Sequence, residues 1–115
     1  MKPVTPRLHG FLDYGSCALM LAAPHLLKLS PTARKVSYAL AGSYLLVSAL
    51  TDYPLAIRRE IPFPVHGKTE LSTIPALLLT ASLQEGSRER AYFLALASTV
   101  AGAYALTDWE ANPDS

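Results

Sequence analysis

The sequence has one cysteine, Cys17, and little charge, because only 17% of its 115 residues are Asp, Glu, Lys or Arg. A single cysteine excludes an intramolecular disulfide framework and a cysteine-rich zinc site. The formal net charge is +1, so the chain lacks the basic surface that neutralises phosphates, and nucleic acid is not an expected partner. Gly-rich phosphate loops and a nucleophile elbow are also missing. The sequence therefore assigns no catalytic residue, and an enzyme is not the favoured interpretation.

Half of the residues are apolar, and most of them lie in four stretches, at about 8–29, 36–51, 71–83 and 91–107. None of the stretches alternates polar with apolar residues, and Ala and Leu dominate, so each predicts a helix. The second and fourth stretches contain no charged residue, and a helix that is apolar on every side lies in a deep core or in lipid. Because a chain this short cannot enclose four such helices, we predict four transmembrane helices. The alternative is a four-helix bundle in water.

The chain contains an internal repeat with an offset of 56 or 57 residues. His9-Gly10 matches His66-Gly67, Asp13 matches Glu70, and the Ala-Leu-Thr-Asp of 49–52 matches that of 105–108. The sequence thus predicts an all-α four-transmembrane-helix bundle, built from two tandem helix pairs in the same orientation. The chain, 1–115, would form a single integral membrane domain with repeats at about 7–53 and 64–109. Five Lys or Arg residues lie on each predicted side, so the positive-inside rule gives no orientation.

The repeat gathers polar side chains at one end of the predicted bundle. They are His9, Asp13, Thr51, Asp52, Arg58, Arg59, His66, Glu70, Thr107 and Asp108. In each repeat the His and the carboxylate are four residues apart, on one helix face. Because imidazole and carboxylate are metal ligands, the two pairs are candidates for a divalent metal site. The simpler interpretation, which the sequence favours, is that the carboxylates complement helix N-termini while the histidines anchor the helices at lipid headgroups.

Other residues at this end carry further expectations. Asp52 and Asp108 follow helix C-termini, where negative charge is unfavourable, so we expect compensation from Arg58 or Arg59, from His9 or His66, or from backbone donors. We predict hydrogen bonds from both Asp side chains to the openings of the first and third helices. Haem between His9 and His66 is a weaker alternative, since both lie at helix ends. The aromatic residues Tyr14, Tyr53, Tyr92 and Trp109 and the segment 53–65 are expected at the lipid interface.

Three motifs resemble a known family. They are His-Gly-x-Leu-Asp-Tyr at 9–14, Thr-Asp-Tyr at 51–53 and Arg-x-Ile-Pro-x-Pro-x-His at 59–66. Over nearly the whole chain, the sequence resembles small bacterial four-helix membrane proteins of the SPW-repeat type. The Ser-Pro-Trp signature of that family is missing, because Ala23-Pro24-His25 and Thr80-Ala81-Ser82 stand in its two places. The resemblance implies a fold and a location in the cell membrane, and it implies no catalytic residue.

Two functional hypotheses follow. The first is a small multi-pass membrane protein of the bacterial inner membrane with a structural or accessory role and no catalytic activity. Its partners would be the lipid bilayer and either further copies of the chain or another membrane protein. The second is a membrane binding or transport module with a His/Asp/Glu metal or proton site at one end of the bundle. Converging side chains of His9, Asp13, His66 and Glu70 would favour the second hypothesis.

Overall fold

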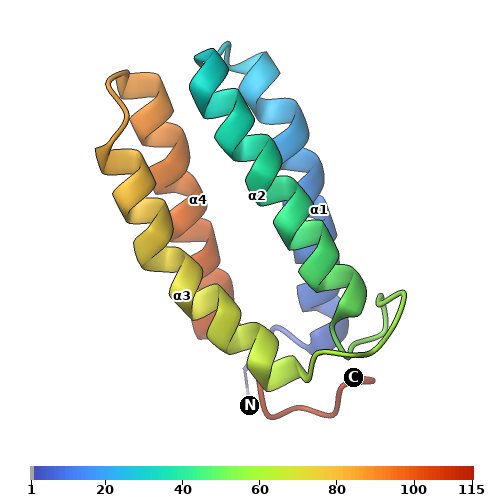
Figure 1. The fold of residues 1–115 in the computed structure, drawn as a ribbon. Helices are drawn as coiled ribbons and strands as arrows, with labels where there is room; N and C mark the ends of the chain where they lie inside the picture. The colour runs from blue at the N-terminus through green and yellow to red at the C-terminus, as the bar shows by residue number, and fades with distance from the viewer. Residues whose placement is uncertain (1) are drawn as a thin grey trace.

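A computed structural model describes residues 2–115, which form four α-helices (Figure 1). The helices are α1 (Pro6–Leu26), α2 (Pro31–Leu50), α3 (Phe63–Ser82) and α4 (Ser87–Leu106). The prediction of an all-α four-helix bundle is confirmed. The third helix starts at Phe63, well before the apolar stretch that begins at Leu71, because the turns that carry His66 and Glu70 are helical too.

Local signals set the starts of the first two helices. Pro6 and Pro31 each occupy the first helical turn, where a missing N–H is no loss. The side chains of Thr5 and Ser30 accept hydrogen bonds from backbone N–H groups three residues later. These N-caps satisfy donors that a helix leaves unpaired. Local sequence signals therefore mark where each of these helices begins.

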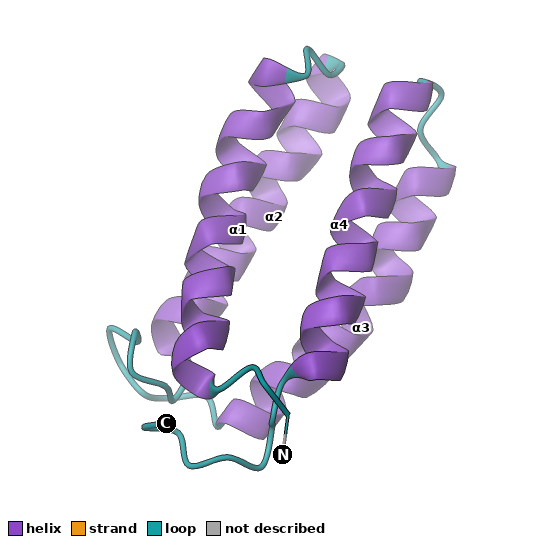
Figure 2. Ribbon diagram, turned by 180° about the vertical axis from the view of Figure 1, so that it is seen from behind, coloured by secondary structure: helices purple, strands orange, loops and turns teal. Residues whose placement is uncertain are grey.

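The four helices form two hairpins, α1–α2 and α3–α4, which stand side by side (Figures 1 and 2). The backbones approach closely within each hairpin, whereas the two hairpins meet mainly through side chains. Both ends of the described chain and the linker 51–62 lie at one end of the bundle, and the two hairpin loops lie at the other. Two isolated parallel β-bridges, Val4–Thr107 and Thr51–Ile61, are equivalent, because each joins the threonine that ends one predicted repeat's second helix to a residue three positions before the start of the other repeat.

None of the helices in residues 2–115 combines the length and the apolarity that crossing a bilayer requires. The prediction of transmembrane helices is therefore not supported. The physical reason is that the helices extend beyond the apolar stretches into charged turns. Lys68 and Glu70 lie within α3, and the charged run 88–90 lies within α4, which lowers the mean hydropathy of both helices.

The apolar core fills the space between the hairpins. Met20 of α1, Leu77 of α3 and Phe93 of α4 are all at most 3% exposed. One polar contact crosses this core: the buried Ser37 hydroxyl donates to the Met20 carbonyl and is hydrogen bonded to Tyr92. Tyr92, expected at a lipid interface, is instead a buried core residue.

Packing explains why glycine follows histidine at position 67 of the second repeat. A Cβ atom at Gly67 would lie 2.8 Å from Cδ2 of Trp109, which is closer than a methyl group tolerates against a rigid ring. A Cβ atom at Gly102, in the middle of α4, would meet nothing within 4 Å. Gly67 thus allows the indole of Trp109 to lie directly on the α3 backbone.

Exchange of these two glycines for alanine is expected to have opposite effects on stability. Gly67→Ala should lower the free energy of unfolding by about 1–3 kcal/mol, because the new methyl group overpacks against Trp109. Gly102→Ala should raise it by up to about 1 kcal/mol, since Ala is the better helix former. Chemical denaturation of both variants measures the difference. Equal effects of the two exchanges would contradict the packing argument.

Candidate metal centre

Four ionisable side chains from α1 and α3 meet inside the bundle. His9 and Asp13 lie in the first turns of α1, and His66 and Glu70 lie in the first turns of α3. All four residues are at most 5% exposed. One potential ligand atom from each lies within 4.8 Å of the other three. The side chains converge on one point, so the interpretation of separate anchors for separate helix ends does not describe their geometry.

Each imidazole contacts both carboxylates. His9 Nε2 lies 2.9 Å from Glu70 Oε1 and 3.3 Å from Asp13 Oδ1. His66 Nε2 lies 3.1 Å from Glu70 Oε1 and 3.1 Å from Asp13 Oδ2. His9 and His66 therefore each have one carboxylate partner on their own helix and one on the other hairpin. The contacts between His9 and Glu70 and between His66 and Asp13 join the two hairpins.

Two threonines fix which ring nitrogen faces the carboxylates. Thr51 Oγ1 lies 2.7 Å from His66 Nδ1, and Thr107 Oγ1 lies 2.8 Å from His9 Nδ1. Each threonine hydroxyl also donates its hydrogen to the backbone carbonyl four residues earlier. Because a hydroxyl has a single hydrogen to donate, Thr51 and Thr107 must accept from Nδ1–H. In a neutral ring the lone pair is then on Nε2, the atom that points at the carboxylates.

This arrangement needs positive charge between the imidazoles and the carboxylates, because an Nε2 lone pair repels a carboxylate oxygen. Protons can supply it. Burial disfavours the imidazolium of His9, but hydrogen bonds to Asp13 and Glu70 outweigh burial and raise its pKa to about 9. The same contributions raise the pKa of His66. Burial likewise disfavours the Asp13 carboxylate, yet its bonds to His66 and His9 hold the pKa of Asp13 below the usual range.

Aromatic side chains close the outer end of the cluster. Tyr53 and Phe63 are at most 1% exposed, and the Tyr53 hydroxyl donates to Asp13 Oδ2 at 3.0 Å. The ring centroid of Trp109 lies 4.9 Å from that of His9. Tyr53, which was expected at a lipid interface, is therefore buried inside the bundle, and for the exposed part of the segment 53–65 the interface stays a prediction. The sequence did carry a signal, since Tyr53 and Trp109 each follow Thr-Asp at the same place in the repeat.

The neighbouring aspartates and arginines lie outside the cluster. Asp52 is paired with Arg59 at 3.2 Å, so an arginine compensates this carboxylate as expected. Arg58 forms an exposed ion pair with Glu60. The Asp108 carboxylate accepts from a backbone N–H two residues later. Neither aspartate side chain bonds to the opening of α1 or α3, so that prediction is wrong.

The threonines make the links that were expected of the aspartates. Thr51 and Thr107 are both in extended backbone conformation at the C-caps of their helices. In extended backbone, successive side chains point to opposite sides. When each threonine points into the bundle, the aspartate after it points out. The motif was recognised in the sequence, but the direction of its two side chains depends on the backbone angle at the cap.

Haem between His9 and His66 does not fit this geometry. A macrocycle bound by both Nε2 atoms would need the space between them, and the carboxylates of Asp13 and Glu70 contact both atoms. A single ion is the cofactor whose size suits this cluster.

No protein family, curated protein or solved structure matches the chain. The resemblance to SPW-repeat proteins therefore stays a prediction that rests on the three sequence motifs. The argument for function has to come from the geometry of the cluster.

The pKa of His9 leads to a stability prediction for protein kept free of metal by a chelator. Because the folded-state pKa of about 9 lies above the ordinary value of 6.5, the stabilisation is complete below pH 6.5 and is lost as the pH rises through about 9. The expected loss is on the order of 3 kcal/mol in the free energy of unfolding. Chemical denaturation across this pH range measures it. His9→Gln should reduce the slope and leave the part that comes from His66, whose pKa is also raised, and a flat wild-type profile would contradict the prediction.

Proposed function

We propose that this protein binds one divalent transition-metal ion through His9, Asp13, His66 and Glu70. The observation that carries the proposal is the pair of threonine hydrogen bonds, which direct both Nε2 lone pairs at the carboxylates. Metal-binding histidines commonly donate the other ring N–H to a second group, which fixes the tautomer and orients the ring. Thr51 and Thr107 have this role here.

Charge balance supports a divalent ion. With both histidines neutral, the two carboxylates give the buried cluster a charge of −2, and buried charge is strongly unfavourable unless it is paired. One divalent cation neutralises this charge, as do two protons on the imidazoles. The ion and the two protons are therefore alternatives for the same place, and metal binding at neutral pH releases protons.

The donor set indicates which ions fit. Two imidazole nitrogens and two carboxylate oxygens suit Zn²⁺, Fe²⁺ and Mn²⁺, whereas Ca²⁺ and Mg²⁺ prefer oxygen donors alone. Donors on a tetrahedral ion lie about 3.4 Å apart when the bonds are about 2.1 Å long. The four contacts between Nε2 and carboxylate oxygens are 2.9–3.3 Å long. The chosen ligand atoms all lie within 4.8 Å of one another, so the side chains would have to draw closer around a bound ion.

Calorimetric titration of chelator-treated protein with Zn²⁺ tests the proposal. We expect binding of one equivalent, with proton release, and no competition by Mg²⁺ or Ca²⁺. His9→Gln/His66→Gln should weaken Zn²⁺ binding on the order of 100-fold or more, because both nitrogen donors are lost.

The third histidine of the chain provides the matched control. His25 lies near the far end of α1, where it contacts Tyr38, so His25→Ala should bind Zn²⁺ like the wild type. Wild-type protein that shows no saturable Zn²⁺ binding, or equal binding by the double variant and the wild type, would overturn the proposal. Circular dichroism of each variant establishes that it is folded.

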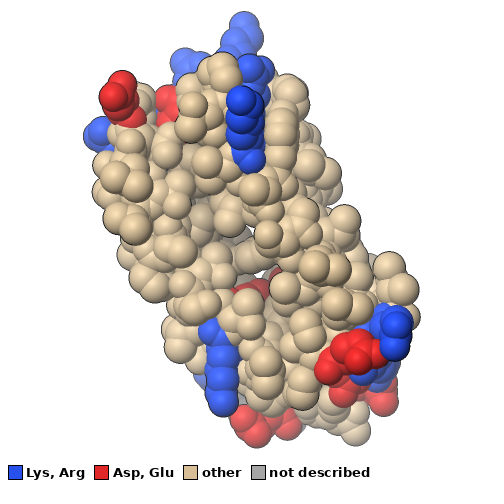
Figure 3. Space-filling model, in the orientation of Figure 1, with Lys and Arg blue, Asp and Glu red and all other residues tan. Residues whose placement is uncertain are grey.

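A second observation bears on location. Each helix exposes large apolar side chains, such as Phe11 (59%), Leu46 (62%), Leu79 (62%) and Leu94 (43%). On the face shown in Figure 3, the charged residues gather at the two ends and the surface between them is nearly uncharged. Apolar surface of this extent marks contact with a partner or with lipid. We propose that lipid acyl chains cover it, which keeps the cell membrane as the proposed location.

Flotation with phospholipid vesicles tests the lipid contact. The protein should float with neutral vesicles at high salt, because the attraction is apolar and is not screened by ions. Protein that stays in the aqueous fraction as a defined oligomer would show that further copies of the chain cover the surface. A monomer that stays in water without detergent would contradict both possibilities. The structural or accessory role stays a prediction.

A further inference from the structure

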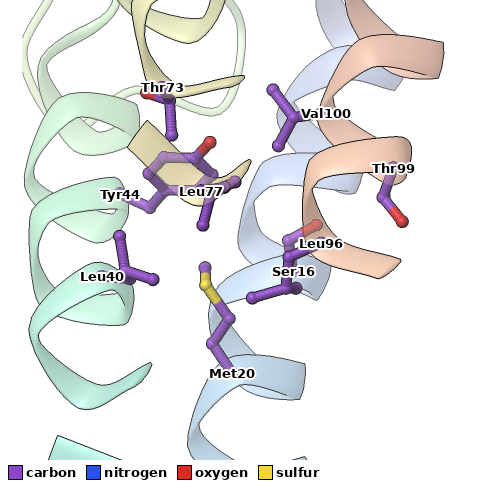
Figure 4. Close-up of a pocket in the computed structure, with 9 residues that line it drawn as sticks. All are labelled: Ser16, Met20, Leu40, Tyr44, Thr73, Leu77, Leu96, Thr99 and Val100. Atoms are coloured by element: carbon purple, nitrogen blue, oxygen red, sulfur yellow. The ribbon is translucent and has the colours of Figure 1, made fainter. Parts of the chain in front are cut away.

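Long stretches without charge separate the two ends of the bundle. No Asp, Glu, Lys or Arg occurs at positions 14–27, 36–51, 71–84 and 91–107, which cover the middle of the four helices. The close-up in Figure 4 shows nine side chains around a cavity in this middle part, contributed by all four helices, and none of them is charged. The charges at the two ends can therefore be compared as two separate surfaces.

The end that carries the two hairpin loops has a positive surface, and we call it the basic end. It has five basic and two acidic residues, a net charge of +3, namely Lys28, Arg34, Lys35, Arg88, Arg90, Glu85 and Glu89. The opposite end has five basic and five acidic residues outside the buried cluster, namely Lys2, Arg7, Arg58, Arg59, Lys68, Asp52, Glu60, Asp108, Glu110 and Asp114. In Figure 3, most charged atoms at the basic end are blue, whereas blue and red are mixed at the other end. The low net charge of the whole chain therefore does not describe the basic end.

Ion pairs neutralise exposed arginines at the opposite end. Arg58 is paired with Glu60 at 2.8 Å. Arg59 is paired with Asp52 at 3.2 Å and with Asp114 at 2.6 Å. Among residues 2–115, every ion pair between exposed side chains lies at that end. The positive charge of the basic end is therefore available to a partner.

Hydrogen bonds join the two hairpin loops into one surface. Arg88, in the first turn of α4, donates from Nη1 to the Leu27 carbonyl oxygen at 2.9 Å. The backbone N–H of Ser30 donates to Glu89 Oε2 at 2.9 Å, so this carboxylate is turned toward the other loop. A guanidinium has five N–H donors, and the contact with Leu27 uses one of those of Arg88. The basic residues of both hairpins are thus held on a common surface.

Exposed leucines lie among these basic residues. Leu26 is 80% exposed, Leu83 is 71% exposed and Leu27 is 42% exposed. Apolar side chains beside Lys and Arg are typical of segments at a lipid interface, where apolar groups enter the acyl layer and cations contact anionic headgroups. A polyanion dissolved in water would leave the leucines exposed. The combination of leucines and cations therefore favours a lipid surface as the partner.

We propose that the basic end binds anionic phospholipid headgroups, with its Lys and Arg side chains at the phosphate groups and its leucines in the outer acyl layer. The inference rests on the proposed lipid contact and adds the end of the bundle and the class of lipid. The negative potential of an anionic membrane attracts basic residues that lie within about a Debye length of its surface. This attraction gives the protein a direction relative to the membrane, which the equal count of Lys and Arg at the two ends does not.

Flotation titrations with two kinds of vesicle test this inference. One kind contains phosphatidylcholine alone, and the other contains phosphatidylglycerol and phosphatidylcholine in equal amounts. At low salt we expect half-maximal binding to the anionic vesicles at a lipid concentration on the order of 100-fold lower, because each of three net charges contributes a factor of about five. High salt should remove the difference, since ions screen the attraction.

Two double variants locate the attraction on the molecule. Lys28→Gln/Lys35→Gln should bind the anionic vesicles about 25-fold more weakly than the wild type at low salt, and should bind the neutral vesicles equally well. Lys2→Gln/Lys68→Gln is the matched control, because it removes the same charge from two exposed lysines at the opposite end. The control should bind both kinds of vesicle like the wild type. Circular dichroism of each variant establishes that it is folded.

The outcomes separate this inference from the lipid contact itself. Equal binding of the wild type to both kinds of vesicle at low salt overturns the role of the basic end and leaves the apolar lipid contact standing. An equal loss in the two double variants shows attraction to the charge of the whole molecule, which overturns the assignment to the basic end. Protein that binds neither kind of vesicle overturns the lipid contact and, with it, this inference.

Discussion

The structure depends on the two carboxylates that the hairpins share. Asp13 and Glu70 lie in the interior, and each contacts an imidazole of both α1 and α3. Two buried carboxylates would repel each other without positive charge between them. The polar end of the bundle is therefore stable only when protons or a cation fill this place. Folding of the bundle and occupation of the cluster are coupled for that reason.

The cluster follows the internal repeat, with one exception. Each repeat contributes a histidine, a threonine that accepts from Nδ1–H of the other repeat's histidine, and an aromatic ring that packs against that same histidine. The carboxylates differ, because Asp13 uses one oxygen for each histidine, whereas Glu70 uses a single oxygen for both. The extra methylene of glutamate makes this reach possible. This departure from symmetry leaves Oε2 of Glu70 without a hydrogen-bond partner among residues 2–115.

The same four helices carry apolar side chains on their outer surface and charged side chains in their interior. Small residues inside each hairpin, such as Ala33, Ala41 and Ala97, let the helices approach closely. Large apolar side chains, such as Leu46 and Leu79, then point outward. The hairpins can therefore enclose a polar cluster at one end while the outer surface stays apolar. A lipid environment around the bundle would cover the apolar surface and leave the charged cluster enclosed between the hairpins.

The sequence by itself determined the four helices, the repeat and the identity of the ionisable residues. These depend on local propensity, caps and residue spacing, and proline and Ser/Thr caps act without long-range contacts. Only the tertiary structure decided that His9, Asp13, His66 and Glu70 meet at one point, that Thr51 and Thr107 point inward, and that Tyr53 contacts the cluster. The spacing of four residues places a pair on one helix face, but it does not say which face turns toward the other hairpin. That direction follows from the packing of two hairpins and from the extended caps after α2 and α4, which no local pattern encodes.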